Sequence, residues 1–396
     1  MSVTKTAFLG TPGFIPEPDR FSNAELMKAA GANTGNLVFQ LASTEIVDGQ
    51  LEHIGVSGKG YGDITVFRGL NFFVFPAANH LRADGSWDLL TKFLRSLRVP
   101  LVVLGLGAQA AHGESPTQTV SEIRSNSSVM DFVDLLKTKT ALVTVRGAFT
   151  EAVCHELGLR DVLRIGCPSQ FINPDVALGQ SIARQLAEAK SRESFPIAVT
   201  ASAPNELHGW RRDVEARLFS WLATNGGLYI QQSCETELFN GPAGLLNGEA
   251  TYELDRLREQ LAPDMPLDIF VSTLARHFRM HFDARAWMED LSSVSLAIGT
   301  RIHGNMAALA ASRPGVLVIH DARVGELADE MNVPKVFADA FHDASTVQDI
   351  LARTVFDPVA FDAARSRKAG LLATAFERIG LPPSRHLLNL ALRQAA

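Results

Sequence analysis

The sequence predicts an α/β protein of two doubly wound, Rossmann-like domains with a cleft between them. Three observations support this fold class. The chain has 396 residues, more than a single hydrophobic core usually organises. Continuous apolar runs such as residues 100–107 are typical of strands inside parallel sheets, because both faces of those strands are buried. These runs alternate with helical segments in both halves of the chain, which is the rhythm of successive βαβ units.

Residues 1–180 form the predicted N-terminal domain. Its first helix opens with a Ser/Asn cap at residue 22, and a turn-forming cluster at residues 31–36 separates it from the next helix. Strands and helices alternate from there. The predicted helices cover residues 22–30, 37–47, 87–97, 129–136 and 148–157, and the predicted strands cover residues 71–76, 100–107, 140–145 and 162–166.

A polar helical segment, residues 176–195, leads into a predicted C-terminal domain at residues 195–350. Residues 240–265 form a polar insertion in this domain. The C-terminal helices, residues 355–396, are expected to pack back across the first domain. The predicted strands of the second domain are 195–201, 227–232, 267–271, 296–299 and 315–320, and its helices are 211–224, 287–292 and the alanine-rich segment after residue 299.

Composition and charge narrow the range of functions. Hydrophobic residues make up 46% of the chain and charged residues 20%, as in an ordinary globular enzyme. The net charge of −6 argues against a nucleic-acid partner, which usually requires a basic domain or stripe. No apolar run approaches the ~20 residues needed to span a bilayer, and no signal peptide is recognised. We expect the three widely spaced cysteines to be reduced thiols in a cytoplasmic protein.

The clearest chemical signal is the stretch of residues 296–311. A buried strand ends at Gly299 and turns directly into a helix of small residues, with Arg301 and His303 at the turn. In extended backbone, side chains two residues apart point the same way, and the free N–H groups of a helix start attract anions. A fixed cation, a titratable imidazole and a helix start together indicate a phosphate or carboxylate substrate that exchanges a proton.

Other polar residues follow predicted strands. Ligands of open α/β sheets bind beyond the carboxyl ends of the strands, so we expect the site among these residues. Arg146 has the same strand-to-helix setting in the first domain as Arg301 has in the second. The remaining candidates are Asn79, His80, Gln109, His112, Ser202, Asn205, Gln232, His320, Asp321 and Arg323.

Common nucleotide and metal motifs are missing from the sequence. The Gly-x-Asn-x-Gly pattern at residues 31–35 lacks the spacing and the preceding strand of a dinucleotide fingerprint. The sequence contains no phosphate-binding loop, no His-Glu-x-x-His and no Cys-x-x-Cys. His277, Arg279 and His281 have no carboxylate at ligand spacing, so we expect a surface face there and no metal site.

Taken together, four segments resemble the polysaccharide pyruvyl transferase family over about Gly31 to Pro334. Asn36 and Cys167 depart from the aspartates that members commonly have at these positions. The segments are the Gly-x-Asn-x-Gly loop of Gly31, Asn33 and Gly35; Val145-Arg-Gly-Ala-Phe-Thr150 followed by Leu157-Gly158; Ile165-Gly-Cys-Pro-Ser169; and Gly299-Thr-Arg-Ile-His-Gly304, with Arg313-Pro-Gly-Val and Ile319-His-Asp-Ala-Arg323 after it.

The resemblance implies a fold like that of the two-domain GT-B glycosyltransferases, with phosphoenolpyruvate on the C-terminal domain. The implied reaction transfers the enolpyruvyl carbons of phosphoenolpyruvate to two hydroxyls of a sugar, which gives a cyclic pyruvate ketal and phosphate. Arg301 and His303 would be catalytic, and His303 would protonate the donor. Phosphoenolpyruvate is the co-substrate, and no metal or organic cofactor is expected. The predicted donor-binding residues are Arg146, Arg301, Gly304 and Asn305.

The acceptor would be a saccharide, free or lipid-linked, on the N-terminal side of the cleft. A lipid-linked acceptor would bring a cytoplasmic enzyme to the inner face of the cytoplasmic membrane. The sequence leaves the oligomeric state open, and a homo-oligomer is one option. The residues predicted to bind the acceptor or line the cleft are Asn33, Gly35, Asn36, Asn79, Gln109, His320 and Arg323.

Two other functions fit parts of the sequence. One is a GT-B glycosyltransferase or sugar-nucleotide epimerase that uses a nucleotide sugar. Retaining glycosyltransferases often carry two glutamates eight residues apart, and no such pair occurs from Glu193 onward. The other is a non-catalytic protein that binds a glycan or an anion, and the intact Arg301 and His303 argue against it.

Overall fold

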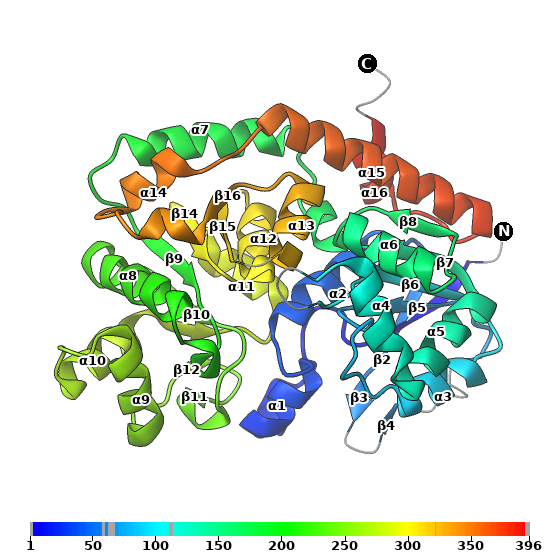
Figure 1. Ribbon diagram of the computed structural model, residues 1–396, viewed down its shortest axis with the longest axis horizontal. Helices are drawn as coiled ribbons and strands as arrows, with labels where there is room; N and C mark the ends of the chain where they lie inside the picture. Colours follow the sequence, from blue (N-terminus) through cyan, green and yellow to red (C-terminus); the bar gives the residue numbers. More distant parts are fainter. Residues whose placement is uncertain (1–2, 58–59, 62–67, 111–113, 321, 393–396) are drawn as a thin grey trace.

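The computed structural model describes residues 3–57, 60–61, 68–110, 114–320 and 322–392. Within these residues the chain forms two α/β lobes, each built on a six-stranded parallel sheet (Figure 1). The predicted fold class is therefore confirmed. Two long helices, α7 (Leu178–Lys190) and α15 (Pro358–Ile379), run along one edge of the molecule and join the lobes.

The first sheet has the strand order β2-β1-β5-β6-β7-β8. Every residue of β6 is buried, as expected for a strand at the centre of a parallel sheet. The strands are β1 (Lys5–Leu9), β2 (Gln50–Ile54), β5 (Phe72–Pro76), β6 (Leu101–Leu106), β7 (Thr140–Val145) and β8 (Val162–Arg164). The helices are α1 (Asn23–Ala29), α2 (Gly35–Glu45), α3 (Asp88–Ser96), α4 (Pro116–Arg124), α5 (Ser127–Lys139) and α6 (Ala148–Glu156).

The second sheet has the order β13-β10-β9-β14-β15-β16. Its strands are β9 (Ile197–Thr200), β10 (Gly227–Gln231), β13 (Phe278–Met280), β14 (Leu296–Gly299), β15 (Gly315–Ile319) and β16 (Lys335–Phe337). Its helices are α8 (Trp210–Asn225), α9 (Thr251–Leu261), α10 (Leu267–His277), α11 (Ala284–Leu291), α12 (Ile302–Ala310), α13 (Ala322–Met331) and α14 (Val347–Arg353). Short hairpins pair β3 (Val56–Ser57) with β4 (Gly60–Tyr61) and β11 (Phe239–Asn240) with β12 (Leu245–Leu246).

The C-terminal helices α15 and α16 (Arg385–Ala391) lie against the first sheet. Leu372 and Phe376 of α15 share a buried cluster with Val74 and Val102, which lie on the central strands β5 and β6. Polar contacts fix the same helix, because the guanidinium of Arg365 donates to the carbonyl oxygens of Gln170 (2.7 Å) and Asp175 (2.6 Å). One face of the first sheet is thus covered by the end of the chain.

Two sequence predictions in the second lobe are wrong. Residues 267–271 begin helix α10, and are not a strand; the apolar run supplies buried Phe270, which packs one helical turn from buried Leu274. His281 is buried rather than on a surface face. Its ring stacks on Trp287 with 5.4 Å between the ring centroids, and its Nε2 lies 2.8 Å from a carboxylate oxygen of Asp290.

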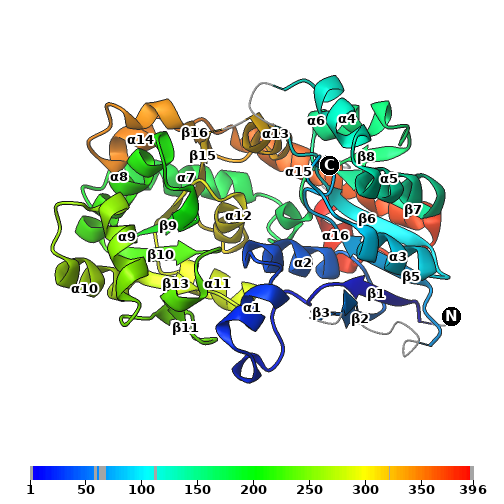
Figure 2. The same ribbon diagram turned by 60° about the horizontal axis from the view of Figure 1, so that its bottom comes forward.

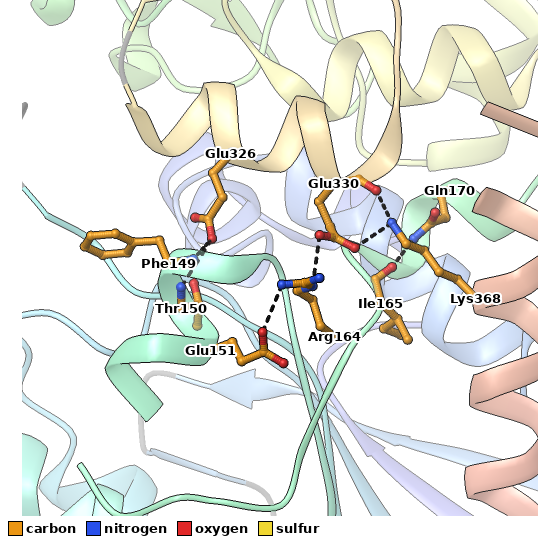
Figure 3. Close-up of polar contacts among 9 residues, drawn as sticks. All are labelled: Phe149, Thr150, Glu151, Arg164, Ile165, Gln170, Glu326, Glu330 and Lys368. Atoms are coloured by element: carbon orange, nitrogen blue, oxygen red, sulfur yellow. Dashed lines mark hydrogen bonds and ion pairs between the residues drawn. The ribbon is translucent and has the colours of Figure 1, made fainter. Parts of the chain in front are cut away.

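Helix α13 fastens the second lobe to the first (Figure 3). The carboxylate of Glu326 accepts hydrogen bonds from the backbone N–H groups of Phe149 and Thr150 at the start of α6. The N-cap residue of α6 is a glycine, which has no side chain to satisfy these groups, so the cap comes from the other lobe.

One turn further along α13, the carboxylate of Glu330 lies 3.2 Å from Arg164 Nε and 2.7 Å from Lys368 Nζ (Figure 3). Lys368 belongs to α15, and its side chain is only 2% exposed. Burial lowers the pKa of Lys368, and its contacts with Glu330 oppose that effect. Three separate elements of the chain therefore meet at one carboxylate.

Glu330→Gln is expected to destabilise the fold by about 3 kcal/mol, because it leaves the buried ammonium of Lys368 without a counter-charge. The double variant with Lys368→Met should recover most of the loss. Urea unfolding followed by tryptophan fluorescence measures both. Glu235→Gln is the control, since its partly exposed pair with Arg256 should contribute only ~0–1 kcal/mol. A Glu330→Gln effect no larger than that of the control would contradict the role of this contact.

Candidate active site

A cleft of about 670 Å³ lies between the lobes, at the carboxyl ends of both sheets. The segments after β5, β6 and β7 line it from the first lobe, and those after β9, β10, β14 and β15 line it from the second. Helices α2 and α12 approach each other between the lobes (Figure 2). The parallel arrangement of the strands explains the site, because all carboxyl ends of one sheet reach the same edge.

Arg301 and His303 both line this cleft. Arg301 is the N-cap residue of α12, with extended backbone, and its side chain is 20% exposed. Its guanidinium Nη2 lies 3.0 Å from the carboxylate of Glu206, and its buried Nε has no hydrogen-bond partner among the described residues. The turn therefore places a cation at the cleft, and one buried N–H group of that cation is unsatisfied among the described residues.

His303 lies in the first turn of α12 and is only 8% exposed. Its ring packs on Phe39 of α2, with 5.3 Å between centroids, and its Nε2 lies 3.6 Å from the sulfur of Cys167. Burial, and then the positive charge of Arg146, lower the pKa of His303 to about 3. The imidazole is therefore neutral near pH 7, and a nearby anion would raise its pKa.

Arg146 enters the cleft from the end of β7. Its guanidinium donates to the carbonyl oxygens of Gly105 (2.8 Å) and Ala77 (3.2 Å) and to Asn79 Oδ1 (3.3 Å). The same group lies 5.7 Å from the centroid of the Phe39 ring. These contacts hold the cation in a fixed position on the first lobe, opposite Arg301 and beside His303.

Two glycines that the sequence placed in the site permit close packing rather than ligand contact. A Cβ on Gly35 would come within 2.5 Å of Gln232 Oε1 and 3.1 Å of His303 Cβ. A Cβ on Gly304 would come within 2.8 Å of Thr200 Cβ and 2.9 Å of Gln232 Nε2. Neither glycine lines the cleft, so their function is to let α2, α12 and the end of β10 meet.

Asn305 was predicted to contact the donor, and its position does not support that prediction. Its side chain is 1% exposed and lies behind the cleft. Its amide donates to Thr200 Oγ1 (3.1 Å) and to the carbonyl oxygens of Gly299 (3.1 Å) and Arg301 (3.0 Å). Asn305 therefore fixes the strand-to-helix turn that carries Arg301 and His303.

Five of the residues predicted on the acceptor side line the cleft, although Asn36 also has a structural function. Its amide donates to the carbonyl oxygens of Ala30 (2.9 Å) and Gly31 (3.3 Å), so it closes the turn before α2. The side chain of Arg323 is outside the described part of the structure, as are residues 112 and 321. The five lining residues are Asn33, Asn36, Asn79, Gln109 and His320.

The other residues expected after strands divide into two groups. Asn205 and Gln232 line the cleft. His80 packs within the first lobe, where its ring lies 4.7 Å from the Trp87 centroid. Ser202 is buried behind the cleft, in the network described next. Position after a strand thus brings a residue to the right edge of the sheet, but packing decides which way it faces.

A buried carboxylate supports the turn that precedes Arg301. Glu215 of α8 accepts hydrogen bonds from the Ser202 backbone N–H (3.1 Å) and from Tyr229 Oη (3.1 Å). The Ser202 hydroxyl lies 3.2 Å from Glu215 and 2.7 Å from the hydroxyl of Thr300. Burial raises the pKa of Glu215 to about 7, although its hydrogen bonds and Arg301 oppose the rise.

Sequence reasoning missed four charged residues that line the cleft: Arg82, Glu206, Arg211 and Glu326. Glu206 ends a short 3₁₀ helix, η4 (Pro204–Glu206), and Arg211 lies in the first turn of α8. Neither directly follows a strand, and Glu326 faces the cleft from the middle of α13. The one sequence feature near Glu206 and Arg211 was Pro204, shortly after a predicted strand. A proline there indicates a turn but does not indicate that charged side chains gather at the cleft.

Within the described ranges, no group of three or more His, Cys, Asp or Glu side chains is arranged to hold a metal ion. No helix in that part of the chain has both the length and the apolar character to cross a bilayer.

The fold and the charged cleft define a two-domain α/β enzyme whose site lies between the domains. The sequence model of the family described as polysaccharide pyruvyl transferase matches residues 60–321, well over half of the chain. The chain belongs to this family, and it is a transferase. Membership supports, in general terms, pyruvyl transfer to a polysaccharide.

Solved structures with a similar shape are distant in sequence. Anabaena Alr3699/HepE in complex with UDP has a TM-score of 0.41 and 12% identity, covering 99% of this chain and 98% of that chain. A glycosyltransferase from Rickettsia africae ESF-5 has a TM-score of 0.34 and 11% identity, covering 99% and 97%. Among curated proteins, none matches the chain at a significant level.

The stability of the protein should depend on the ionisation of Glu215. Its pKa rises on folding from 4.5 to about 7, so the stabilisation of its neutral form is complete below pH 4.5 and is lost as the pH rises through 7. Relative to Glu215→Gln, the wild type should lose about 3 kcal/mol across this window. Urea unfolding of both proteins at several pH values measures the difference. Parallel pH profiles would contradict this assignment.

Cys167→Asp should raise the pKa of His303 from about 3 toward neutrality, because a carboxylate near Nε2 favours the charged imidazole. Cys167→Ser, which places a neutral group there, is the control and should leave the imidazole titration close to that of the wild type. Histidine NMR titration measures all three proteins. An unchanged His303 titration in Cys167→Asp would show that the residue at position 167 does not control this imidazole.

Proposed function

We propose that the protein transfers the pyruvyl group of phosphoenolpyruvate to two hydroxyls of a sugar, forming a pyruvate ketal and releasing phosphate. The sugar would belong to a polysaccharide or to its lipid-linked precursor. The observation that carries this proposal is the position of His303, buried at the cleft between Arg146 of one lobe and Arg301 of the other. Membership of the pyruvyl transferase family supports the same reaction class.

The two arginines suit the charge of the donor. Phosphoenolpyruvate carries a carboxylate and a phosphate, and guanidinium groups bind both through paired, charge-assisted hydrogen bonds. Arg146 and Arg301 come from different lobes, so a donor held between them would span the cleft. In this scheme the donor lies against His303, with its methylene carbon facing the imidazole.

The negative charge of the donor would also raise the pKa of His303, so that the imidazole can carry a proton. Burial holds the pKa of His303 at about 3, and an anion within ~4–6 Å favours the protonated form. Binding of the donor therefore charges His303 and prepares it as a general acid. This coupling restricts proton transfer to the complex that contains the substrate.

The proposed reaction begins with protonation of the donor and ends with closure of the ketal ring. His303 gives its proton to the methylene carbon, which becomes a methyl group, and positive character develops at carbon 2. The first sugar hydroxyl forms a bond to carbon 2 and loses its proton. The C–O bond to phosphate breaks, phosphate leaves, and the second hydroxyl closes the ketal ring. One hydroxyl proton returns to neutral His303, the other passes to His320 or to the departing phosphate, and the scheme uses no metal or organic cofactor.

The acceptor side of the cleft offers uncharged hydrogen-bonding groups. Asn33, Asn79 and Gln109 line it from the first lobe. Gln232 lines it from the second lobe; its side chain is 1% exposed, and its Nε2 has no hydrogen-bond partner among the described residues. Amide groups of this kind suit sugar hydroxyls, which both donate and accept. We therefore assign the acceptor sugar to the part of the cleft that these amide groups line.

The test is a phosphate-release screen with phosphoenolpyruvate across free and lipid-linked oligosaccharides, with product ketal detected by mass spectrometry. His303→Ala should lower turnover at least about a hundredfold, the usual loss for a general acid. His155→Gln, an exposed histidine of α6, is the matched control and should retain wild-type turnover. Full turnover by His303→Ala, or turnover with UDP-sugars and none with phosphoenolpyruvate, would overturn the proposal.

A further inference from the structure

We propose that Glu206 occupies the donor's phosphate position before the donor binds, and that Arg211 is a second phosphate-binding arginine of that position. This inference rests on the proposed function, because it concerns how the same donor is held. It adds two residues that neither follow a strand directly nor form part of the sequence motif around Arg301.

The geometry points to one anion position shared by two cations. A single oxygen of Glu206, Oε2, lies 3.0 Å from Arg301 Nη2 and 3.5 Å from Arg211 Nη1. All three residues line the cleft, and their side chains are partly open to it, with exposed fractions of 38%, 20% and 24% for Glu206, Arg301 and Arg211. An oxygen between two guanidinium groups is the arrangement in which arginines hold a phosphate.

Stability alone does not account for this cluster. A cation in the first turn of a helix is disfavoured by the helix dipole, and Arg211 lies in the first turn of α8. Partly exposed ion pairs contribute only ~0–1 kcal/mol. The Arg211 guanidinium also lies 5.4 Å from the centroid of the exposed Trp210 ring, a weak contact of the same order as the helix-dipole cost, so these local contacts leave the pairing with Glu206 at the cleft to be explained by a ligand.

A phosphate would fit the cluster better than the carboxylate does. Glu206 meets both arginines with one oxygen, and Arg301 Nε remains buried without a partner among the described residues. A phosphate monoester has three terminal oxygens in a tetrahedral arrangement, so it can accept from both guanidinium groups and from Nε together. Its larger charge also balances the two cations, which a single carboxylate does not.

Displacement of Glu206 follows from electrostatics. Its carboxylate and the donor's phosphate repel each other, and both compete for the same two arginines. Glu206 ends the short helix η4 on the edge of the cleft, with its side chain already partly in solvent. After transfer, inorganic phosphate remains between the arginines, and the return of Glu206 favours its release. Glu206 therefore weakens donor binding and speeds the departure of the product.

Isothermal titration calorimetry with phosphoenolpyruvate and with inorganic phosphate tests the inference on the intact chain. Glu206→Gln should bind both about fivefold more tightly, because an ion pair of ~1 kcal/mol no longer opposes them. Arg211→Gln should bind both at least about fivefold more weakly. The matched controls are Glu235→Gln, which removes a comparable carboxylate outside the cleft, and Arg212→Gln, whose side chain pairs with Asp213; both should bind like the wild type.

Steady-state kinetics gives a second readout that a purely structural residue would not produce. In Glu206→Gln the KM for phosphoenolpyruvate should fall and inhibition by phosphate should tighten, while kcat falls because product leaves more slowly. Thermal melting of every variant checks that the fold is retained.

The possible results separate this inference from the function on which it rests. A wild type that binds phosphoenolpyruvate, with Glu206→Gln and Arg211→Gln binding it equally well, overturns the inference and leaves the proposed function intact. A wild type that binds neither phosphoenolpyruvate nor phosphate overturns both. Tighter binding by Glu206→Gln together with weaker binding by Arg211→Gln supports the assignment.

Discussion

The close contact between α2 and the start of α12 determines the geometry of the whole site. Gly35 on α2 leaves room for His303 and Gln232, and Phe39, one turn further on, packs against the imidazole. The backbone N–H of Thr34 donates to the carbonyl oxygen of Gln232 at 2.9 Å, so the two lobes are joined by main chain at the floor of the cleft. The buried side chains of α2 belong to the same hydrophobic cluster as the second sheet. This helix, which precedes most of the first sheet in sequence, therefore holds His303, the proposed general acid, in place and shields it from water.

The sequence predicted the internal strands except β1, and among the edge strands it predicted β8 but missed β2, β13 and β16. Strands β6 and β15 are continuous apolar runs because helices cover both faces, and this pattern is visible without a structure. Strand β2 is mostly half-exposed and contains glutamine, glutamate and histidine. Apolar and polar residues therefore do not alternate clearly along it, and its pairing with β1 is what identifies it as a strand. The error at residues 267–271 has the opposite cause, because a short apolar run fits either a buried strand or the first turns of a helix.

For the site, sequence reasoning found the residues that lie on strand-to-helix turns. Arg146, Arg301 and His303 line the cleft because parallel strands bring their carboxyl ends to one edge. The electrostatic environment of these residues could not be predicted from the sequence. The low pKa of His303 depends on burial by α2 and on the charge of Arg146 from the other lobe, so neither is visible near residue 303. Glu206 and Glu326 were missed for the same reason: each binds a group far away in sequence, Arg301 and the start of α6 respectively.

In the proposed mechanism, a protein acid in the cleft protonates the donor's methylene carbon as the pyruvyl group is transferred. The most direct measurement is NMR of the ketal formed in D₂O from unlabelled phosphoenolpyruvate. An acid such as the His303 imidazole exchanges its proton with solvent before it acts, so the ketal methyl group should carry one deuterium. A fully protiated ketal methyl group, or phosphate release that yields free pyruvate and no ketal, would contradict it.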